Sequence, residues 1–324
     1  MISVYGRGGQ YATAIGAGVI LIAIASLLSL FYIPLWVTAS ALSMLAAFVF
    51  TRHFSVRMGQ KKTAGRVWMA ASDKYPGPDT SKLPAVYFLY VLGSGGHTTE
   101  MVEMIKHKFR GSKNLHRRYL ITTGDRHSQN KELELEAIIH DAYVMGTGGT
   151  YDTMLVTRAR AVHQSFFTSI FTTLMCAFEI IAALTMIPEK RPKDQYGEAF
   201  RYPHVIVTNG PGTGFIVCLV AQVLKIFYLA PENRLKMVYV ESWARIKSLS
   251  LTGKLFYWTD IADLFVVQSD SLSKVTGKPN VGNVSMRTTP VGLDYGRREA
   301  WPGDYDPHRG SSKAASARKD TTNT

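Results

Sequence analysis

The chain opens on a long apolar segment. No charged residue lies between Arg7 and Arg52, and the stretch from Ile15 to Phe50 is almost wholly apolar. A helix needs about 20 apolar residues to cross a bilayer, whereas the apolar region of a signal peptide has only about 7 to 15. We therefore predict an N-terminal transmembrane helix that stays attached. Pro34 within the run is compatible with one tilted crossing and an interfacial stretch, which we favour, or with a tight helical hairpin.

Basic residues flank the apolar segment unequally. Only Arg7 precedes it, whereas the residues that follow include Arg52, Arg57, Lys61, Lys62 and Arg66. Basic flanks of this kind are retained on the cytoplasmic side of a membrane. The folded part of the chain is therefore predicted to face the cytosol. The same basic cluster could contact anionic lipid headgroups or could be an ordinary solvated linker.

Beyond a polar, proline-containing stretch, short apolar runs alternate with glycine-containing loops and longer helical patterns. The strand-like runs are Ala85 to Leu92, Arg118 to Thr122, His204 to Val207, Lys236 to Val240 and Leu264 to Val267. Helical patterns begin near Thr98, Gln129, Gln164 and Gly214. This β-α alternation predicts the α/β class, with a single Rossmann-like doubly wound parallel sheet behind the transmembrane helix.

Two of the helical patterns are unusually apolar. Phe166 to Ile187 and Phe215 to Ala230 could be transmembrane by hydropathy alone. A helix that covers a parallel sheet can be nearly as apolar, so we favour that interpretation. Either helix could still expose an apolar flank to the bilayer and bring the domain onto the lipid surface.

These patterns divide the chain into four parts. Residues 1–52 are the predicted membrane anchor, 53–84 a basic and proline-containing linker, and 85–270 the Rossmann-like domain. Residues 271–324 are a predicted disordered polar tail, because apolar periodicity ends near Ser271. The chain therefore has sequence for only one α/β domain.

The net charge and the cysteine content narrow the classes of binding partner and cofactor. A net charge of +13 on an apolar-rich chain indicates an anionic partner, which could be nucleic acid, lipid headgroups or a phosphorylated substrate. No nucleic-acid motif accompanies the charge, and the membrane segment argues against such a partner. The two cysteines, Cys176 and Cys218, lie in apolar runs without metal-ligand spacing. Neither a disulfide framework nor a metal site is therefore indicated, and no cofactor is predicted.

A glycine-rich loop joins the first predicted strand to a helix. It reads Gly93-Ser94-Gly95-Gly96-His97-Thr98-Thr99-Glu100. Glycines let backbone N–H groups face an anion at the positive end of the helix, so a phosphate or diphosphate is the natural ligand. Thr98 or Thr99 could cap the helix. The dinucleotide fingerprint is incomplete, because Thr98 replaces its third glycine, and the P-loop pattern lacks its Gly-Lys pair.

A second glycine-rich loop follows a later strand. It reads Asn209-Gly210-Pro211-Gly212-Thr213-Gly214, and it should lie at the same carboxyl edge of the sheet, where open α/β sheets bind ligands. The candidate binding residues are Gly93, Ser94, Gly95, Gly96, Thr98, Thr99, Asn209, Gly210, Gly212 and Thr213. His97 could take a proton from a substrate hydroxyl near neutral pH, or could only cap or pack.

Three motifs together resemble one known family. They are Val91 to Met101, Asn209 to Thr213, and the run Val240-Glu241-Ser242-Trp243-Ala244-Arg245-Ile246-Lys247-Ser248-Leu249-Ser250-Leu251-Thr252-Gly253-Lys254. This order resembles the asparagine-linked-glycosylation protein fourteen family, the membrane subunit of the UDP-N-acetylglucosamine transferase that makes dolichol-diphosphate chitobiose. The resemblance covers roughly Ala85 to Gln268.

The resemblance implies one half of a split GT-B glycosyltransferase, similar to the acceptor-side half of bacterial MurG. A soluble donor-binding subunit would complete the heterodimer and supply most contacts to UDP-GlcNAc, so this chain should not be active alone. The acceptor would be a dolichol-diphosphate-linked sugar at the endoplasmic reticulum membrane, with the nuclear envelope as a further location. The family reaction inverts the anomeric centre without a metal, which makes His97 the candidate base. Glu241 and Arg245 would line the same crevice or form a structural ion pair.

The chain departs from the family pattern in two places. Thr157-Arg158-Ala159-Arg160-Ala161 keeps both arginines of a Pro-Arg-Ser-Arg-Glu-like stretch but loses the proline and the acid. Gln268 is followed by Ser269 and a polar tail, instead of a tryptophan and a compact apolar end that docks the partner. Two alternatives to the acceptor half are a pure membrane tether and a self-contained nucleotide-cofactor enzyme.

Overall fold

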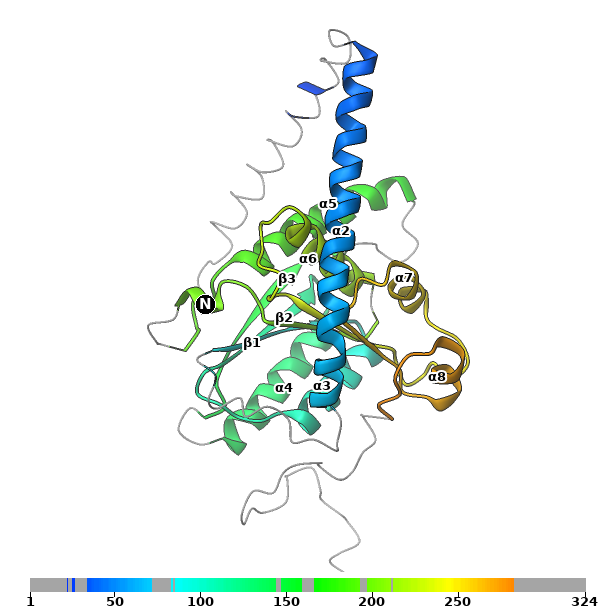
Figure 1. The fold of residues 1–324 in the computed structure, drawn as a ribbon. Coiled ribbons are helices and arrows are strands. Elements are labelled where there is room, and N and C mark those ends of the chain that lie inside the picture. The colour runs from blue at the N-terminus through cyan, green and yellow to red at the C-terminus, as the bar shows by residue number, and fades with distance from the viewer. Residues whose placement is uncertain are drawn as a thin grey trace, which may run out of the picture. The chain divides into compact units, whose positions relative to one another are not determined.

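The computed structural model describes residues 22, 25–26, 34–71, 83, 85–143, 147–158, 166–192, 197–210 and 212–282 (Figure 1). Most of the predicted anchor before Pro34 and the predicted tail after Gly282 lie outside these residues. The Arg160 position of the altered basic motif also lies outside them.

Six parallel strands form one sheet. They are β1 (Val86–Leu92), β2 (Leu115–Thr122), β3 (Thr150–Val156), β4 (Val205–Thr208), β5 (Lys236–Val240) and β6 (Leu264–Val266). Their spatial order is β3-β2-β1-β4-β5-β6, and every neighbouring pair is parallel. The direction of winding reverses between β1 and β4. This confirms the predicted Rossmann-like doubly wound sheet.

Helices cover both faces of the sheet (Figure 1). One apolar core lies under α3 (Gly96–Lys108) and α4 (Arg126–Ala142), and a second lies under α5 (Phe166–Thr185) and α6 (Gly212–Ile226). Alternation along the strands fills both cores: Leu120 of β2 faces α5 and α6, while its neighbour Ile121 faces α3 and α4. The helices α7 (Leu251–Thr259) and α8 (Asp270–Thr276) contribute Phe256 and Leu272 to the second core.

The strand β3 is missing from the sequence prediction. Its residues Thr150, Asp152 and Thr153 are polar, so the segment lacks the apolar run that identified the other strands. Asp152 pairs with Arg118 of β2, with Nη2 2.6 Å from Oδ2, and Thr153 donates to Glu132 of α4 at 3.0 Å. Polar partners on neighbouring elements therefore hold this edge strand together with the apolar packing of Val156.

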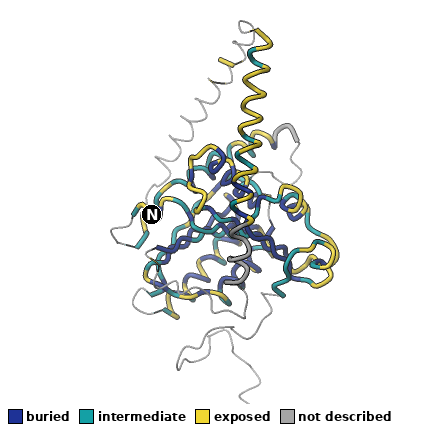
Figure 2. The backbone as a smooth tube through the Cα atoms, viewed as in Figure 1, coloured by how far each residue is buried: buried dark blue, intermediate teal, exposed yellow. Residues whose placement is uncertain are grey.

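The anchor helix extends further than its apolar segment. The helix α2 runs without a break from Leu35 to Ala71, so residues 53–71, which the sequence analysis assigned to a linker, are helical. Pro34 precedes the helix and its carbonyl accepts the N–H of Val37, which is a position that proline tolerates. The part Leu35–Lys61 is long and apolar enough to cross a membrane, and no residue of its most apolar window is buried (Figure 2).

The described structure continues past Ser271, where the sequence predicts the start of the polar tail. The chain beyond Ser271 continues into α8, and Val267 bridges to Asn280, so ordered structure extends to Gly282. Leu272 is fully buried in the core, and Ser273 donates to the carbonyl of Lys278 at 2.7 Å. A single apolar side chain in a polar segment is enough to dock this short helix, but it produces no periodicity in the sequence.

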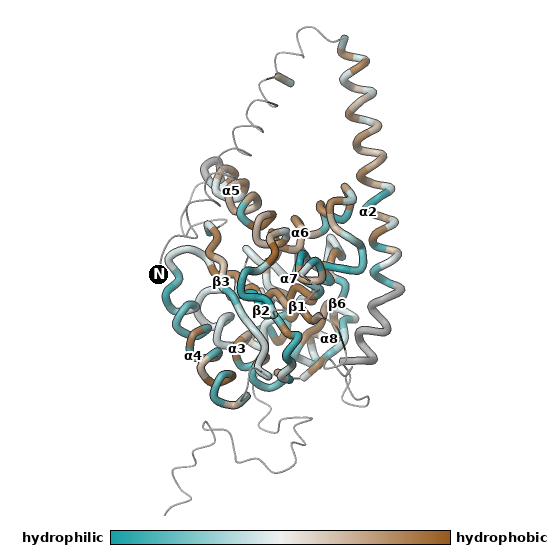
Figure 3. Tube along the Cα trace, turned by 90° about the vertical axis from the view of Figure 1, so that its left-hand side faces the viewer, coloured by the Kyte–Doolittle hydropathy of each residue, from teal (hydrophilic) through white to brown (hydrophobic). Residues whose placement is uncertain are grey.

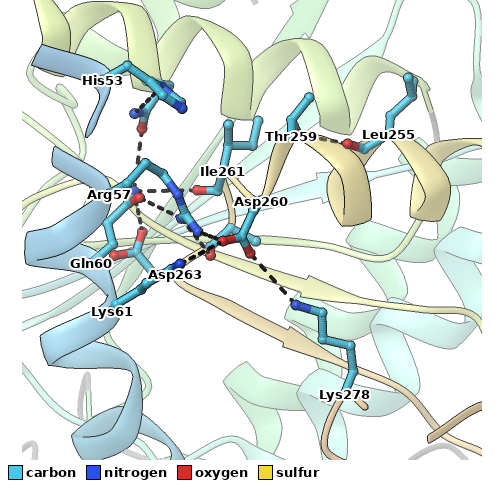
Figure 4. A network of polar contacts seen from close by, with 12 residues as sticks. His53, Arg57, Gln60, Lys61, Leu255, Thr259, Asp260, Ile261, Asp263 and Lys278 are labelled. Carbon is cyan, nitrogen blue, oxygen red and sulfur yellow. Dashed lines mark hydrogen bonds and ion pairs between the residues drawn. The ribbon is translucent and has the colours of Figure 1, made fainter. Parts of the chain in front are cut away.

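Polar contacts fix the second half of α2 to the domain (Figure 4). Arg57 forms an ion pair with Asp260 after α7 and donates to the carbonyl of Ala262 at 3.4 Å. Gln60, which is buried, donates to Asp263 at 3.3 Å, and Asp263 in turn accepts the N–H of Met237 in β5 at 2.9 Å. We call Arg57, Gln60, Asp260 and Asp263 the α2 clamp. It fixes α2 to the domain at Arg57 and Gln60.

Candidate functional site

The two glycine-rich loops meet where the sheet winding reverses. The first follows β1 and the second follows β4, and these strands are neighbours. The side chain of Asn209 donates to the carbonyl of His97 at 2.7 Å, which ties the second loop to the first turn of α3. The predicted juxtaposition of the loops is therefore present in the structure. Ligands of open α/β sheets bind at this position.

The first loop leaves the start of α3 open. The helix begins at Gly96, and its N-cap residue Gly95 has φ +64° and no side-chain cap. Ser94, Gly95, Gly96 and Thr99 are exposed. The first N–H groups of a helix have no partner within the helix, and the positive end of the helix dipole lies there. This arrangement is suited to an anion such as a phosphate.

Thr98 does not cap α3 and does not face the open loop. It is fully buried, and its hydroxyl contacts the carbonyl of Gly93 and the hydroxyl of Ser128, the latter at 2.6 Å. Ser128 also donates to the carbonyl of Gly93 at 2.9 Å and to Asp125 at 2.8 Å. The threonine thus holds the shape of the glycine loop, and its own hydroxyl is not available to a ligand.

His97 lies at the junction of the two loops and is half-buried. A Cβ atom placed on Gly210 would lie 2.7 Å from Cε1 of His97, so the imidazole rests directly on this glycine. Of the five buried side-chain atoms without a hydrogen-bond partner in the described part of the chain, three lie here: Nδ1 of His97, Oδ1 of Asn209 and Oγ1 of Thr208. Buried polar atoms are nearly always paired, so this concentration indicates a functional site.

Glu100 organises the loops around this point, although the sequence analysis did not include it among the site residues. Its buried carboxylate accepts Nε2 of Gln268 at 2.6 Å, the backbone N–H of Trp243 at 2.9 Å and Nδ2 of Asn209 at 3.4 Å. One side chain on α3 therefore joins the loops that follow β4, β5 and β6. The only sequence signal was an acid at the start of a helix, which also suits an ordinary helix.

Glu241 and Arg245 do not form the ion pair that was one of the two predictions for them. Glu241 is fully buried and accepts the N–H and hydroxyl of Ser250 at 3.3 and 3.2 Å. Burial raises the pKa of its carboxyl, and the hydrogen bonds from Ser250 oppose that shift. Arg245 is exposed. Glu241 therefore supports the start of α7, whereas Arg245 is accessible in the loop after β5.

The second loop contributes residues of two kinds. Asn209 and Gly210 are buried against His97, as described above, while Gly212 is exposed at the start of α6 and Thr213 is buried. Pro211 lies outside the described residues.

An apolar surface lies next to the loops. Trp243 and Ile246, in the loop after β5, are 43% and 57% exposed, and Leu251 and Trp258 of α7 are 74% and 71% exposed. We call these four residues the β5–α7 surface. Large exposed apolar residues that lie close together along the chain are typical of a protein-binding surface.

The doubly wound parallel sheet defines a Rossmann-like α/β protein. An uncapped helix start suited to an anionic group lies at its reversal point, and α2 is long and apolar enough to span a membrane. Residues 88–284 match the family model described as "Oligosaccharide biosynthesis protein Alg14 like". The match spans more than half of the chain, and the chain belongs to this family.

Curated relatives agree with the family. The chain is 35% identical over 183 residues to "UDP-N-acetylglucosamine transferase subunit ALG14" of Candida albicans, covering 56% of this chain and 70% of the relative. The human protein of the same name is 28% identical over 211 residues, covering 64% and 85%. That of Schizosaccharomyces pombe is 31% identical over 187 residues, covering 58% and 77%. No solved structure matches the chain.

Proposed function

We propose that this chain is the membrane-anchoring, acceptor-binding subunit of a UDP-GlcNAc transferase that adds the second GlcNAc to GlcNAc-diphosphodolichol. Family membership supports the role, because the relatives are named as subunits of a UDP-N-acetylglucosamine transferase. The chain acts at the endoplasmic reticulum membrane and its continuation in the nuclear envelope, with the domain in the cytosol.

The observation that carries the acceptor role is the open start of α3 beneath His97. The N–H groups after Gly95 bind the acceptor diphosphate at the positive end of the helix. His97 takes the proton of the attacking sugar hydroxyl as its oxygen bonds to the anomeric carbon of GlcNAc and UDP leaves, which inverts that centre. The hydrogen bonds to Glu100 hold the loops after β4, β5 and β6 in position around the reacting groups. The chemistry requires no metal in this scheme.

A partner subunit supplies the donor site. A GT-B enzyme needs two Rossmann-like domains, and the described part of this chain has one sheet. The β5–α7 surface lies beside the site and offers exposed aromatic residues to a soluble donor-binding subunit. The heterodimer therefore binds UDP-GlcNAc through the partner and the lipid-linked acceptor through this chain.

The proposal is tested by GlcNAc transfer to a diphosphate-linked polyprenol-GlcNAc in membranes that carry this chain, with and without the soluble partner. We expect transfer only with both chains. His97→Ala is expected to lower transfer by about 100-fold, the usual scale for loss of a general base, while partner binding is unchanged.

The matched control is His140→Ala, because His140 is exposed on α4 and far along the chain from both loops. Transfer by this chain alone would overturn the split-enzyme proposal. Full activity of the His97 variant, equal to that of the control, would assign His97 to the structure of the loop. Partner binding without any binding of acceptor would favour a pure tether.

A further inference from the structure

A continuous line of hydrogen bonds joins the β5–α7 surface to His97. The backbone N–H of Trp243 donates to Oε1 of Glu100 at 2.9 Å, and Oε2 of Glu100 accepts Nδ2 of Asn209 at 3.4 Å. The same Nδ2 donates to the carbonyl of His97 at 2.7 Å. One carboxylate and one amide therefore connect an exposed loop with the candidate base.

The centre of this line is buried between the layers of the domain. The helix α3, which carries Glu100, and the helix α7, which follows the loop of Trp243, lie on opposite faces of the sheet (Figure 3). Glu100 is 3% exposed, and Gln268 also donates to its Oε1, at 2.6 Å. A displaced donor would leave a buried carboxylate oxygen poorly paired, which is costly, so the other donors must follow it.

The outer end of the line is accessible to a partner. Residues 243–248, between β5 and α7, are exposed and form no helix or strand. Trp243 is 43% exposed, so a protein that binds the β5–α7 surface covers its indole. The N–H that donates to Glu100 belongs to the same residue. Burial of the indole against a partner therefore acts directly on the first hydrogen bond of the line.

The inner end of the line can shift without the loss of a bond at two of its atoms. Oδ1 of Asn209 and Nδ1 of His97 are buried and have no hydrogen-bond partner in the described part of the chain. Buried polar atoms are nearly always paired, so this arrangement is less than fully satisfied. A small movement of the Asn209 amide thus carries the backbone of His97 with it and costs nothing at these two atoms.

We propose that Glu100 is a positioning residue that couples the β5–α7 surface to His97. When the soluble subunit binds over Trp243, the carboxylate of Glu100 transmits the displacement to Asn209 and sets the imidazole for proton transfer. The partner then supplies the donor site and also brings the acceptor side into its active arrangement. This inference rests on the proposed function and deepens it, because it adds a reason for inactivity of the chain alone.

Glu100→Gln is the test variant, because it keeps the size of the side chain and removes one acceptor. Its amide oxygen can still accept the donors of Trp243 and Gln268. Its NH₂ group then faces Nδ2 of Asn209, which is also a donor. The line is therefore cut between Glu100 and Asn209, while the bond from Asn209 to His97 is kept.

Two further variants accompany it. Glu103→Gln is the matched control on the same helix, since Glu103 pairs with Lys106 at 2.9 Å and 34% of its side chain is exposed. Trp243→Ala changes the outer end of the line and leaves the buried carboxylate intact.

Both measurements use the full-length protein in detergent, with the soluble partner absent or at a saturating concentration. The first is the rate at which diethyl pyrocarbonate modifies His97, read by mass spectrometry with the exposed His140 as internal reference. The second is GlcNAc transfer at varied acceptor concentration. We expect the partner to change the modification rate of His97 several-fold in the wild type and in Glu103→Gln, but not in Glu100→Gln or Trp243→Ala. The kcat of Glu100→Gln should fall about 10-fold with an unchanged acceptor KM, because a misplaced base slows proton transfer.

A partner effect on His97 that persists in Glu100→Gln would overturn the proposal and show that the partner covers His97 directly. Equal kcat in the Glu100 and Glu103 variants would also overturn it. If Glu100→Gln does not fold, Trp243→Ala decides, since a full partner effect on His97 in that variant excludes the surface as its origin. Absence of GlcNAc transfer by the wild-type pair would contradict the proposed function separately, because modification of His97 is read without transfer.

Discussion

Gly210 is the residue on which the position of His97 depends. Its φ of +139° lies in the region that favours glycine, and its Cα faces the imidazole so closely that no side chain fits between them. A loop glycine at this point therefore serves two needs, the backbone conformation and the space for His97.

Gly210→Ala is expected to displace His97 and to lower transfer by about 10- to 100-fold, because a misplacement of about 1 Å at a reacting group has effects of that size. The control is Gly124→Ala, which imposes similar backbone strain at φ +85° but has no atom within 4 Å of the new methyl group. Transfer rates with the partner present, and thermal midpoints in detergent, are compared for the two variants. Equal loss of activity in both would mean that strain alone is responsible.

At the scale of single residues, the sequence predicted that the two loops lie together, but it did not predict the contacts within them. The spacing of the loops placed His97, Asn209 and Gly210 together, because the ends of neighbouring parallel strands meet at one edge. It could not show that the hydroxyl of Thr98 turns inward to Gly93. Nor could it identify Glu100, because the partners of this carboxylate come from loops more than 100 residues further along the chain.

The strand β3 illustrates how an element can depend on charge. Asp152 is the partner of both Arg118 and His116 of β2. Burial alone would raise the pKa of Asp152, but the hydrogen bonds from Arg118 and His116 outweigh that effect and hold its pKa at about 2. A carboxyl with a lowered pKa stabilises the fold above its unfolded pKa, and this contribution is lost as the pH falls toward the folded value.

Asp152→Asn is therefore expected to destabilise the domain by about 2 kcal/mol at pH 7 and to flatten the pH dependence of its unfolding free energy between about pH 4 and pH 2. Denaturant unfolding in detergent at a series of pH values measures both effects. Glu134→Gln is the control, since the pair of Glu134 with Lys131 is exposed and should contribute little. An unchanged slope in the Asp152 variant would exclude this residue as the origin of the acid sensitivity.

At the scale of elements, the apolar runs predicted five of the six strands, and the helical patterns predicted the four longest helices of the domain. The missed elements include β3, α7 and α8, which are short or polar. They are positioned by tertiary contacts such as Asp152 with Arg118 or Leu272 with the core. Local pattern carries little information about an element whose stability comes from distant partners.

For the whole molecule, the α2 clamp is expected to determine how firmly the α/β domain is attached to the anchor helix. Arg57→Ala removes the buried basic partner of Asp260 and leaves Lys61 and Lys278 near that carboxylate. We expect a loss on the order of 2 kcal/mol in the attachment of α2. Limited proteolysis of the 53–71 segment in membranes should then become faster, and transfer should fall with it.

Lys61→Ala provides the comparison, because the amino group of Lys61 lies 3.7 Å from the same carboxylate of Asp260 but its side chain is 67% exposed. A double-mutant cycle with Asp260→Ala separates the pair from the rest of the clamp. Proteolysis at the same rate in the Arg57 and Lys61 variants would mean that apolar packing, and not the clamp, holds α2.

The unbroken course of α2 has a consequence for where the protein resides. A transmembrane helix usually adapts to a thicker or thinner bilayer by changing its tilt. Here a change of tilt would swing the entire sheet, because the helix continues rigidly from its apolar half into the clamp. The lipid must deform instead, at a cost that rises with mismatch. The uncharged part of α2 from Leu35 to Phe50 is about 24 Å long, which is closer to the hydrocarbon thickness of the endoplasmic reticulum membrane, about 27 Å, than to that of the thicker plasma membrane. The chain is thus expected to be sorted by bilayer thickness.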